Sequence, residues 1–331
     1  MKSAVVVGGS GFIGSVLLRR LCDRGVTCVN LDCRPSPFYP KITRLIDVCD
    51  RAALNGVMTE ADAIFLLAAE HADDVKPISL YYDVNVRGAR NVCHAADRVG
   101  NRQIIFTSSV AVYGLNANNP DEGAPLSPFN EYGKSKLEAE EVLHNWAANG
   151  PDRTLIVVRP VVVFGERNRG NVYNLIDTIR ARRFIMVGNG HNRKSMAYVE
   201  NVAAFLEWVV DRSSGVTTFN YADKPDLTMN ELVATICTTL GHAPPRLKLP
   251  YAAGLIAGRL FDLVAQLTGQ RFPVSEIRVR KFCANTQVDA RKTSSAGFQP
   301  LFDLMEGINL TIHHDFLGGR IDQVWFKGSD G

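Results

Sequence analysis

The sequence lacks the cysteine spacing that metal sites and disulfide frameworks need. Its seven cysteines are odd in number, and no two of them are spaced as Cys-x-x-Cys. This scatter argues against a structural zinc site and against a disulfide-bonded secreted scaffold. We therefore expect no bound metal and a reducing compartment.

The sequence also has little excess of either charge and few long apolar runs. The formal net charge is only +3, with no block of like charge, no low-complexity segment and no internal repeat. Such a balance gives no reason to expect a nucleic-acid partner. The first residues, MKSAVVVGG, enter a strand-like run at once, so we expect no signal peptide and a cytoplasmic protein.

A glycine turn follows that first strand. The stretch AVVVGGSGFIGSVLLRRLCDRG runs from β-branched residues through Gly8, Gly11 and Gly14 into an amphipathic helix. Glycines in this context allow a tight turn and let the backbone approach a pyrophosphate at the helix N-terminus. The pattern predicts a dinucleotide-binding site.

The next strand, VTCVNLDCR, ends at Asp32, about twenty residues beyond the glycine turn. A carboxylate at that place accepts hydrogen bonds from a ribose 2′-hydroxyl and repels a 2′-phosphate, whereas Arg34 would attract that phosphate. The position of Asp32 at the strand end favours NAD over NADP, with an ordinary turn-starting aspartate as the structural alternative.

Strand and helix patterns continue to alternate beyond this point. Apolar runs at 63–70 and 103–114 end in small or polar residues, and 81–100 between them is helical in pattern and ends at Gly100. This order predicts an α/β, Rossmann-type doubly wound parallel sheet, with Ala68, Ala69, Ser108 and Ser109 at strand ends.

Alternation stops after FGERNRG, where we expect a smaller mixed α/β C-terminal lobe to begin. The predicted NAD-binding domain comprises 1–165 with 191–222. The predicted substrate-binding lobe comprises 166–190 with 223–331.

The stretch NEYGKSKLEAEE places Tyr132 four residues before Lys136 on one face of a predicted helix. An ammonium beside a phenol favours the phenolate and lowers the phenol's pKa towards neutrality. Such a pair also arises by chance on solvated helices, so its meaning depends on its neighbours.

Together these motifs resemble the extended short-chain dehydrogenase/reductases, which include NAD-dependent epimerases and dehydratases. GGSGFIG, FTSSVAVYG, YGKSK, RPVVVFG and VGNGHNRKSMAYVENV follow one another in the order typical of that family. The resemblance implies that Tyr132 is the catalytic acid/base, that Lys136 supports it and holds the nicotinamide ribose, and that Ser109 positions the substrate oxygen. It also implies a homodimer.

The same resemblance implies two sets of contacts. The cofactor-binding residues would be Gly8, Gly11, Phe12, Ile13, Asp32, Asp47, Val48, Ala68, Ala69, Asn85, Ser108, Tyr132, Lys136 and Pro160. The substrate-binding residues would be Ser109, Tyr132, Asn171, Arg193 and Lys194, the last at a place where many members carry a diphosphate-binding arginine.

The two residues after Ser109 narrow the reaction. Sugar dehydratases of the family carry a carboxylate pair there, but this chain has Val110 and Ala111, which cannot exchange protons. An oxidised substrate can then only be reduced again, which leaves epimerisation or simple dehydrogenase or reductase chemistry. Val162, in place of an asparagine common in sugar-nucleotide members, weakens a plain UDP-sugar assignment.

Several phrases in both lobes, among them RPVVVFGERNRGNVYNLI and VRKFCANTQ, resemble members that invert carbon 4 of N-acetylglucosamine joined through diphosphate to a polyprenol. Such enzymes serve O-antigen and related surface polysaccharides. A soluble UDP-sugar 4-epimerase, a keto-sugar or hydroxysteroid-type reductase, and a non-catalytic nucleotide sensor remain open, although Ser109, Tyr132 and Lys136 together argue against the sensor.

One helix of the second lobe, within 249–269, stands apart in composition. Arg259, Asp262 and Gln266 form one stripe, and the opposite stripe is apolar: Ile256, Leu260, Leu263, Val264 and Leu267. The segment is too short and too charged to span a bilayer. Either it docks on the domain core or it lies at the cytoplasmic surface of the inner membrane, where Arg271, Arg278, Arg280 and Lys281 would suit anionic headgroups.

Overall fold

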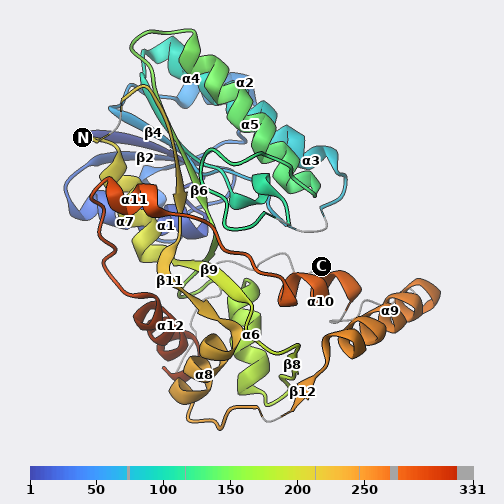
Figure 1. Cartoon of the computed structure of the whole chain (residues 1–331). Helices are drawn as coiled ribbons and strands as arrows, with labels where there is room; N and C mark the ends of the chain where they lie inside the picture. Colours follow the sequence, from blue (N-terminus) through green and yellow to red (C-terminus); the bar gives the residue numbers. More distant parts are fainter. Residues whose placement is uncertain (73–74, 116, 213, 246, 269–274, 319–331) are drawn as a thin grey trace.

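A computed structural model describes residues 1–331 except 73–74, 116, 213, 246, 269–274 and 319–331 (Figure 1). Its centre is a seven-stranded sheet in the order β10-β6-β5-β4-β1-β2-β3, and every pair of neighbours is parallel. The strands are β1 Ser3–Val7, β2 Thr27–Asp32, β3 Thr43–Leu45, β4 Ala63–Leu66, β5 Gln103–Thr107, β6 Thr154–Pro160 and β10 Val216–Tyr221.

Helices cover both faces of this sheet, which is why its strands are short runs of buried apolar residues. On one face lie α1 (Phe12–Asp23) and α7 (Val199–Val209), which pack against each other. On the other lie α2 (Arg51–Val57), α4 (Gly88–Val99) and α5 (Glu131–Ala148) (Figure 1). The predicted Rossmann-type fold is confirmed by this architecture.

The segment 81–100 is helical as predicted and ends at Gly100, whose φ of 82° lies in the left-handed region. It is not one regular helix, however. The chain passes from α3 (Ser79–Tyr82) through a π-helical turn, η2 (Asp83–Arg87), into α4. A π turn changes the direction of side chains locally and is often found at functional sites, and here it carries Asn85.

The second lobe is built around a three-stranded sheet in the order β11-β9-β7, comprising β7 Val162–Phe164, β9 Arg193–Tyr198 and β11 Asp223–Thr228. A two-stranded pair joins β8 Met186–Val187 to β12 Lys248–Leu249. The helices packed here are α6 (Asn171–Arg180), α8 (Met229–Thr239) and α12 (Leu304–Ile312), which share a separate apolar core with the sheet.

Two segments cross the domain division expected from sequence. β9 pairs with β7 and β11 and not with the central sheet. Near the C-terminus, α11 (Arg291–Ser295) packs on β10, and Phe298 joins the apolar core under α7. The domain boundaries near residues 165, 191 and 222 therefore stay a prediction. The chain passes between the two lobes more often than these boundaries imply.

The remaining pair of helices forms an arm (Figure 1). α9 (Tyr251–Thr268) extends away from the body of the protein and packs against α10 (Glu276–Cys283). The predicted basic residue Arg271 lies outside the described residues. Among the helices that the structure describes, none is both long enough and apolar enough to cross a membrane.

Candidate active site

The glycine turn after β1 is held by close backbone contacts. Gly8 has a φ of 90°, and a Cβ at this position would lie 2.4 Å from the Ala68 amide nitrogen. A Cβ on Gly14 would lie 2.5 Å from the Gly8 carbonyl oxygen. Gly11 precedes α1 without a side-chain cap, which leaves the helix N-terminus open to an anion. These residues fit the pyrophosphate of a dinucleotide.

Asp32 is fixed at the end of β2 beside this turn. Its carboxylate is 7% exposed and accepts hydrogen bonds from the backbone nitrogens of Ser10 (2.9 Å) and Arg34 (2.9 Å). The Arg34 side chain is exposed, while the Arg34 carbonyl oxygen accepts a bond from the Ser10 hydroxyl (2.9 Å). These bonds fix the carboxylate beside the glycine turn, and its contact with a cofactor ribose stays a prediction.

The other predicted cofactor residues lie at the same edge of the sheet. Each follows the carboxyl end of a strand or begins the helix after it, and in parallel sheets these ends meet at one edge. Their places are Phe12 and Ile13 in α1, Asp47 and Val48 after β3, Ala68 and Ala69 after β4, Ser108 after β5 and Pro160 ending β6. Their contacts with a cofactor stay predictions.

Asn85 links this edge to the catalytic helix. Its Nδ2 donates to the Ser135 hydroxyl (2.8 Å) and to the Glu70 carbonyl oxygen (3.0 Å), and its Oδ1 accepts from the Glu70 amide (2.9 Å). Ser135 is adjacent to Lys136. Asn85 therefore holds the chain after β4 against α5, in addition to its predicted contact with the cofactor.

Ser109, Tyr132 and Lys136 come together at the ends of β5 and α5. Ser109 follows β5 and caps the short helix η3 (Val110–Tyr113), its hydroxyl accepting from the Ala111 amide (3.1 Å). Tyr132 lies in the first turn of α5, which Asn130 caps through the Gly133 amide (2.9 Å). The Tyr132 and Ser109 side chains are hydrogen-bonded to each other.

Lys136 lies one turn further along α5 and is 1% exposed. Burial lowers the pKa of its ammonium to about 7, and the negative charge of Glu140 opposes this shift. The Nζ lies 4.1 Å from the centroid of the Phe106 ring. Within the described part of the chain it forms no ion pair, so the ammonium rests on an aromatic face.

The pKa of Tyr132 differs from the expectation. Burial raises the pKa of the phenol, and only the hydrogen bond from Ser109 lowers it. The predicted direct effect of Lys136 is not found among the groups that act on it. The physical reason is that Tyr132 is buried, which disfavours the phenolate more than the hydrogen bond with Ser109 favours it.

The predicted substrate residues of the second lobe are engaged with the protein itself. The Lys194 Nζ donates to the carbonyl oxygens of Lys281 (2.8 Å) and Ala284 (2.6 Å), and burial lowers its pKa to about 8. The Arg193 Nη1 donates to the Asp226 carbonyl oxygen (2.8 Å). Asn171 begins α6. Their contacts with substrate stay predictions.

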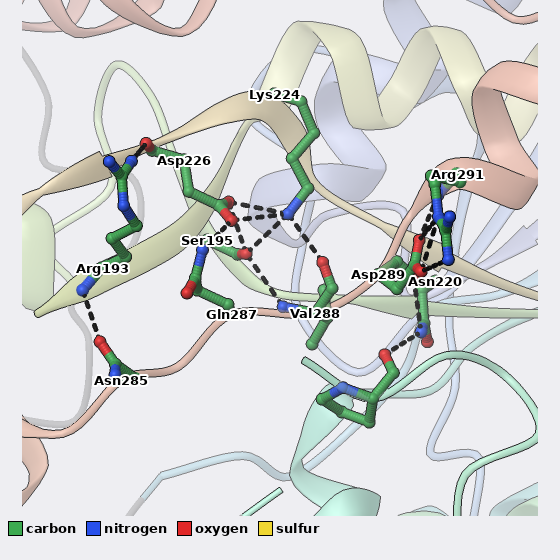
Figure 2. A network of polar contacts seen from close by, with 11 residues as sticks. Arg193, Ser195, Asn220, Lys224, Asp226, Asn285, Gln287, Val288, Asp289 and Arg291 are labelled. Carbon is green, nitrogen blue, oxygen red and sulfur yellow. Dashed lines mark hydrogen bonds and ion pairs between the residues drawn. The ribbon is translucent and has the colours of Figure 1, made fainter. Parts of the chain in front are cut away.

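A polar network next to these residues anchors the chain after α10 (Figure 2). Lys224 donates to the Asp226 carboxylate (2.8 Å), the Ser195 hydroxyl (3.2 Å) and the Val288 carbonyl oxygen (2.7 Å). Gln287 also donates to Asp226 (2.8 Å). Together with Lys194, these bonds fix the segment 281–288 against the β9–β11 pair.

That segment forms one wall of a cavity of about 620 Å³. Sequence reasoning found its cations but missed its amide and aromatic side chains, which come from distant parts of the chain. The cavity is lined by Leu115, Val187, Gly188, Asn189, Asn192, Tyr251, Ile277, Arg280, Lys281, Cys283 and Ala284.

The cavity lies close to the catalytic helix. The Lys281 Nζ lies 5.5 Å from the centroid of the Phe129 ring, and Phe129 comes three residues before Tyr132. Leu115 follows η3, the helix that Ser109 caps. The cavity is therefore bordered by segments that adjoin the predicted catalytic residues in the chain.

Comparison with known proteins agrees with this geometry. The model of the NAD dependent epimerase/dehydratase family matches residues 4–222, and the chain belongs to that family. One relative is 48% identical over 98% of this chain and 98% of its own length: the N-acetyl-alpha-D-glucosaminyl-diphospho-ditrans,octacis-undecaprenol 4-epimerase of Escherichia coli O157:H7. The decarboxylating sterol-4-alpha-carboxylate 3-dehydrogenase of Mus musculus is 26% identical over 95% of this chain and 91% of its own.

Solved structures share the fold. The UDP-glucose 4-epimerase of Thermus thermophilus in complex with NAD matches with a TM-score of 0.75 at 20% identity, covering 96% of this chain and 100% of its own. MoeE5 in complex with UDP-glucose and NAD matches with a TM-score of 0.75 at 22% identity, covering 94% and 98%. Family membership confirms the predictions of an enzyme and of NAD as its cofactor.

Cofactor preference tests the assignment of Asp32. Because its carboxylate is fixed beside the glycine turn, we expect NAD to bind at least about tenfold more tightly than NADP, a difference of about 1.4 kcal/mol. Titration of the apoprotein with both nucleotides measures this ratio. Asp32→Asn keeps the acceptor for the Ser10 amide but loses the charge, so the preference for NAD over NADP should become smaller. Equal affinity in the unmodified protein would contradict the assignment.

Removal of one hydroxyl tests the acid/base. Tyr132→Phe should retain the fold and bound NAD, while turnover falls by about two to four orders of magnitude because the proton-transfer group is gone. Ser109→Ala should reduce mainly the rate, and Lys136→Ala both rate and cofactor binding. Tyr82→Phe, which removes a hydroxyl bonded to Glu131 at the start of the same helix, is the matched control. Near-normal turnover of Tyr132→Phe would show that another group moves the proton.

Proposed function

We propose that the enzyme interconverts N-acetylglucosamine and N-acetylgalactosamine while the sugar is attached to undecaprenyl diphosphate, in the synthesis of O-antigen or a related surface polysaccharide. The observation that carries this proposal is the relative named for that activity, which is 48% identical along nearly the whole of both chains. The cavity and the arm of the second lobe support it independently.

The catalytic residues account for the chemistry at carbon 4. NAD, when bound, supplies a reversible hydride acceptor. Ser109 positions the substrate hydroxyl, and Tyr132 takes its proton as the carbon is oxidised and returns it on reduction. Lys136 supports the tyrosine and the nicotinamide ribose. Inversion then requires the keto sugar to present its other face before the reduction.

The residues after Ser109 favour epimerisation over elimination. Val110 and Ala111 form the start of η3, so the two side chains next to the catalytic serine cannot act as acid or base. Expulsion of water from a keto sugar needs such groups. The oxidised substrate is therefore reduced again at the same carbon.

The basic wall of the cavity suits a diphosphate. Arg280 and Lys281 line it, together with the amides of Asn189 and Asn192. Arg280 is held by Glu276, with Nη2–Oε1 at 2.7 Å, which orients a planar guanidinium that binds phosphate oxygens well. Lys194 acts indirectly, because its bonds to the carbonyl oxygens of Lys281 and Ala284 fix this wall.

The polyprenol would be met by α9. Two residues of its polar stripe contact α10: the Arg259 side chain, which is itself 62% exposed, pairs with Glu276 (2.8 Å), and Asp262 accepts from the Glu276 amide (2.9 Å). Its apolar stripe is exposed, with Ile256 at 59%, Leu260 at 58% and Leu263 at 53%. An apolar stripe exposed to this extent favours an apolar environment outside the protein.

The same surface supports a location at the membrane. An exposed apolar helix next to Arg278 and Arg280 fits the interface of an anionic membrane, where cations meet headgroups and leucines enter the acyl boundary. We place the enzyme in the cytoplasm, peripheral to the inner membrane, where a polyprenyl-linked sugar is accessible. A homodimer is expected by family resemblance only and stays a prediction.

A soluble UDP-sugar 4-epimerase is the second candidate. It is favoured by the fold shared with epimerase structures that contain UDP-glucose or NAD, although these are too distant in sequence to assign a substrate. The relatives also include a sterol dehydrogenase at 26% identity, which makes reductase activity a further candidate. A diphosphate is common to both epimerase substrates, so the lipid is what separates them.

Substrate choice is tested with pure enzyme and two substrates that share the same sugar. We expect efficient epimerisation of polyprenyl-diphosphate N-acetylglucosamine, and about two orders of magnitude less on UDP-N-acetylglucosamine, because binding energy from the lipid contributes to the reaction. Product sugars are measured after mild acid release. Efficient turnover of the UDP-sugar with none on the lipid-linked sugar would favour the soluble candidate.

Membrane contact is tested by Leu260→Glu with Leu263→Glu. Burial of one leucine contributes about 1.5–3 kcal/mol, so the double variant should bind anionic phosphatidylglycerol vesicles more than about tenfold less tightly while its melting temperature barely changes. Vesicle co-sedimentation measures the loss. Leu301→Glu with Leu310→Glu, at exposed sites of 53% and 38% outside the arm, is the matched control.

Two outcomes would oppose this contact. Equal vesicle binding by the two double variants would exclude α9 as the membrane surface. A variant that instead dissociates from dimer to monomer in sedimentation velocity would show that α9 is covered by a second copy of the chain. Unfolding of the lobe would indicate that the apolar stripe of α9 docks on the domain core, because an unpaired buried charge is costly.

A further inference from the structure

A fully buried ion pair lies directly behind the catalytic residues. Arg159 on β6 and Glu140 on α5 are 4% and 2% exposed. They make a two-pronged contact, with Arg159 Nη2 at 2.6 Å from Glu140 Oε2 and Nε at 3.0 Å from Oε1. Neither residue is among those expected from sequence to contact cofactor or substrate.

The pair is the centre of a network that joins the chain segments carrying the catalytic groups. The Ser108 hydroxyl donates to Glu140 Oε1. Arg159 Nη1 donates to the Tyr113 hydroxyl (2.8 Å), which donates in turn to Asn220 Oδ1 (2.8 Å). The network thus connects β5, η3, α5, β6 and β10 at one place.

Each contact point is one step from a catalytic residue. Ser108 is the neighbour of Ser109, and Tyr113 ends the short helix that Ser109 caps. Glu140 lies one helical turn beyond Lys136 and two turns beyond Tyr132 on α5. A shift of either partner would therefore change the distance between Ser109 and the two other catalytic side chains.

Stability alone gives little reason for such a pair. Removing two charges from water is costly, and apolar residues of similar volume often serve a core equally well or better. The surrounding clusters are already apolar, with Ile105, Val157 and Phe106 buried beside the network. A requirement of the site accounts for the charges better than a requirement of the fold.

We infer that the Glu140–Arg159 pair is the positioning element of the active site: it fixes Ser109 relative to Lys136 and places a carboxylate one helical turn from the lysine. Glu140 and Arg159 are positioning residues, because they act through Ser108, Tyr113 and Lys136. The inference rests on the catalytic roles proposed above for Ser109, Tyr132 and Lys136.

The charges around Lys136 support an electrostatic role for Glu140. Glu140 is the charged group that raises the pKa of Lys136, against burial, which lowers it to about 7. From the elements packed on α5, Tyr82 contacts Glu131 and Asp97 contacts Trp146, near the two ends of the helix. Arg159 faces Glu140 and also donates to the Tyr113 hydroxyl, and Tyr132 faces Ser109.

The sign of the expected effect follows. Loss of the Glu140 charge removes an influence that raises the pKa of Lys136, so the lysine would deprotonate at a lower pH. Activity that requires the ammonium would then be lost at lower pH, on the alkaline side of the pH profile. If the pair only supported the fold, loss of the Glu140 charge would lower the stability of the protein and leave the alkaline limb of the pH profile unchanged.

The test uses the holoenzyme and the pH dependence of kcat. Glu140→Gln keeps the shape and an acceptor for Ser108 but removes the charge, and should move the alkaline limb down by about one pH unit, giving roughly a tenfold loss of kcat above the limb. Glu140→Asp, which keeps the charge, should restore the position of the limb. Glu140→Gln combined with Arg159→Met covers the case in which a stranded arginine prevents folding.

Glu207→Gln is the matched control. Glu207 is 8% exposed and pairs with Arg20 (2.9 Å) and Arg24 (2.8 Å) between α1 and α7, away from the catalytic residues. It should lower the melting temperature and leave the pH profile unchanged. The control separates the general cost of breaking a buried pair from an effect on the site.

Each remaining outcome decides the question. If Glu140→Gln and the double variant keep the wild-type alkaline limb, or if neither of them folds, the pair is structural and the inference is wrong. Tyr132→Phe and Lys136→Ala report on the proposed function separately. Their inactivity beside an unshifted Glu140→Gln profile would overturn the positioning role and leave the function standing.

Discussion

The close approach of two backbone segments at the edge of the central sheet governs the rest of the site. Gly8 and the chain at Ala68 lie so near that a Cβ on the glycine would meet the amide nitrogen at 2.4 Å. This contact lies where the strand order passes from β1 to β4, so the connections leave in opposite directions and open a crevice. The glycine turn, Asp32 and Ser109, the predicted catalytic serine, all lie along it because parallel strands end there together.

Lys136 illustrates the free-energy cost of burying an ammonium at this edge of the sheet. Burial moves the pKa of its ammonium from 10.5 to about 7, which corresponds to several kcal/mol. A cation over an aromatic ring gains about 2 kcal/mol when desolvated, so Phe106 alone does not offset the loss. The negative charge of Glu140 limits this shift, and Arg159 holds the Glu140 carboxylate in place. A lysine near neutrality is well suited to support a proton-transferring tyrosine.

Local patterns explain why the cofactor edge could be predicted and the substrate lobe only in part. The glycine turn, Asp32 and the Tyr132–Lys136 spacing are each written in fewer than about thirty consecutive residues, where strand, turn and helix chemistry suffice. Lys194 and Arg193 were assigned to substrate by position, but their partners at 226, 281 and 284 come from distant segments. The pKa of Tyr132 also depends on burial, which spacing on a helix does not reveal.

The arm shows the same limit in another form. The two stripes of α9 were visible in the sequence, but an amphipathic pattern does not say which stripe meets the protein. In the structure the buried positions of α9 are Gly254 and Gly258, Arg259 and Asp262 contact Glu276 of α10, and Leu260 and Leu263 lie in solvent. A soluble protein gains nothing from that arrangement, because exposed apolar area is unfavourable in water. It becomes favourable only when another apolar surface covers the stripe, and a substrate with a polyprenyl chain requires such a surface next to the cavity.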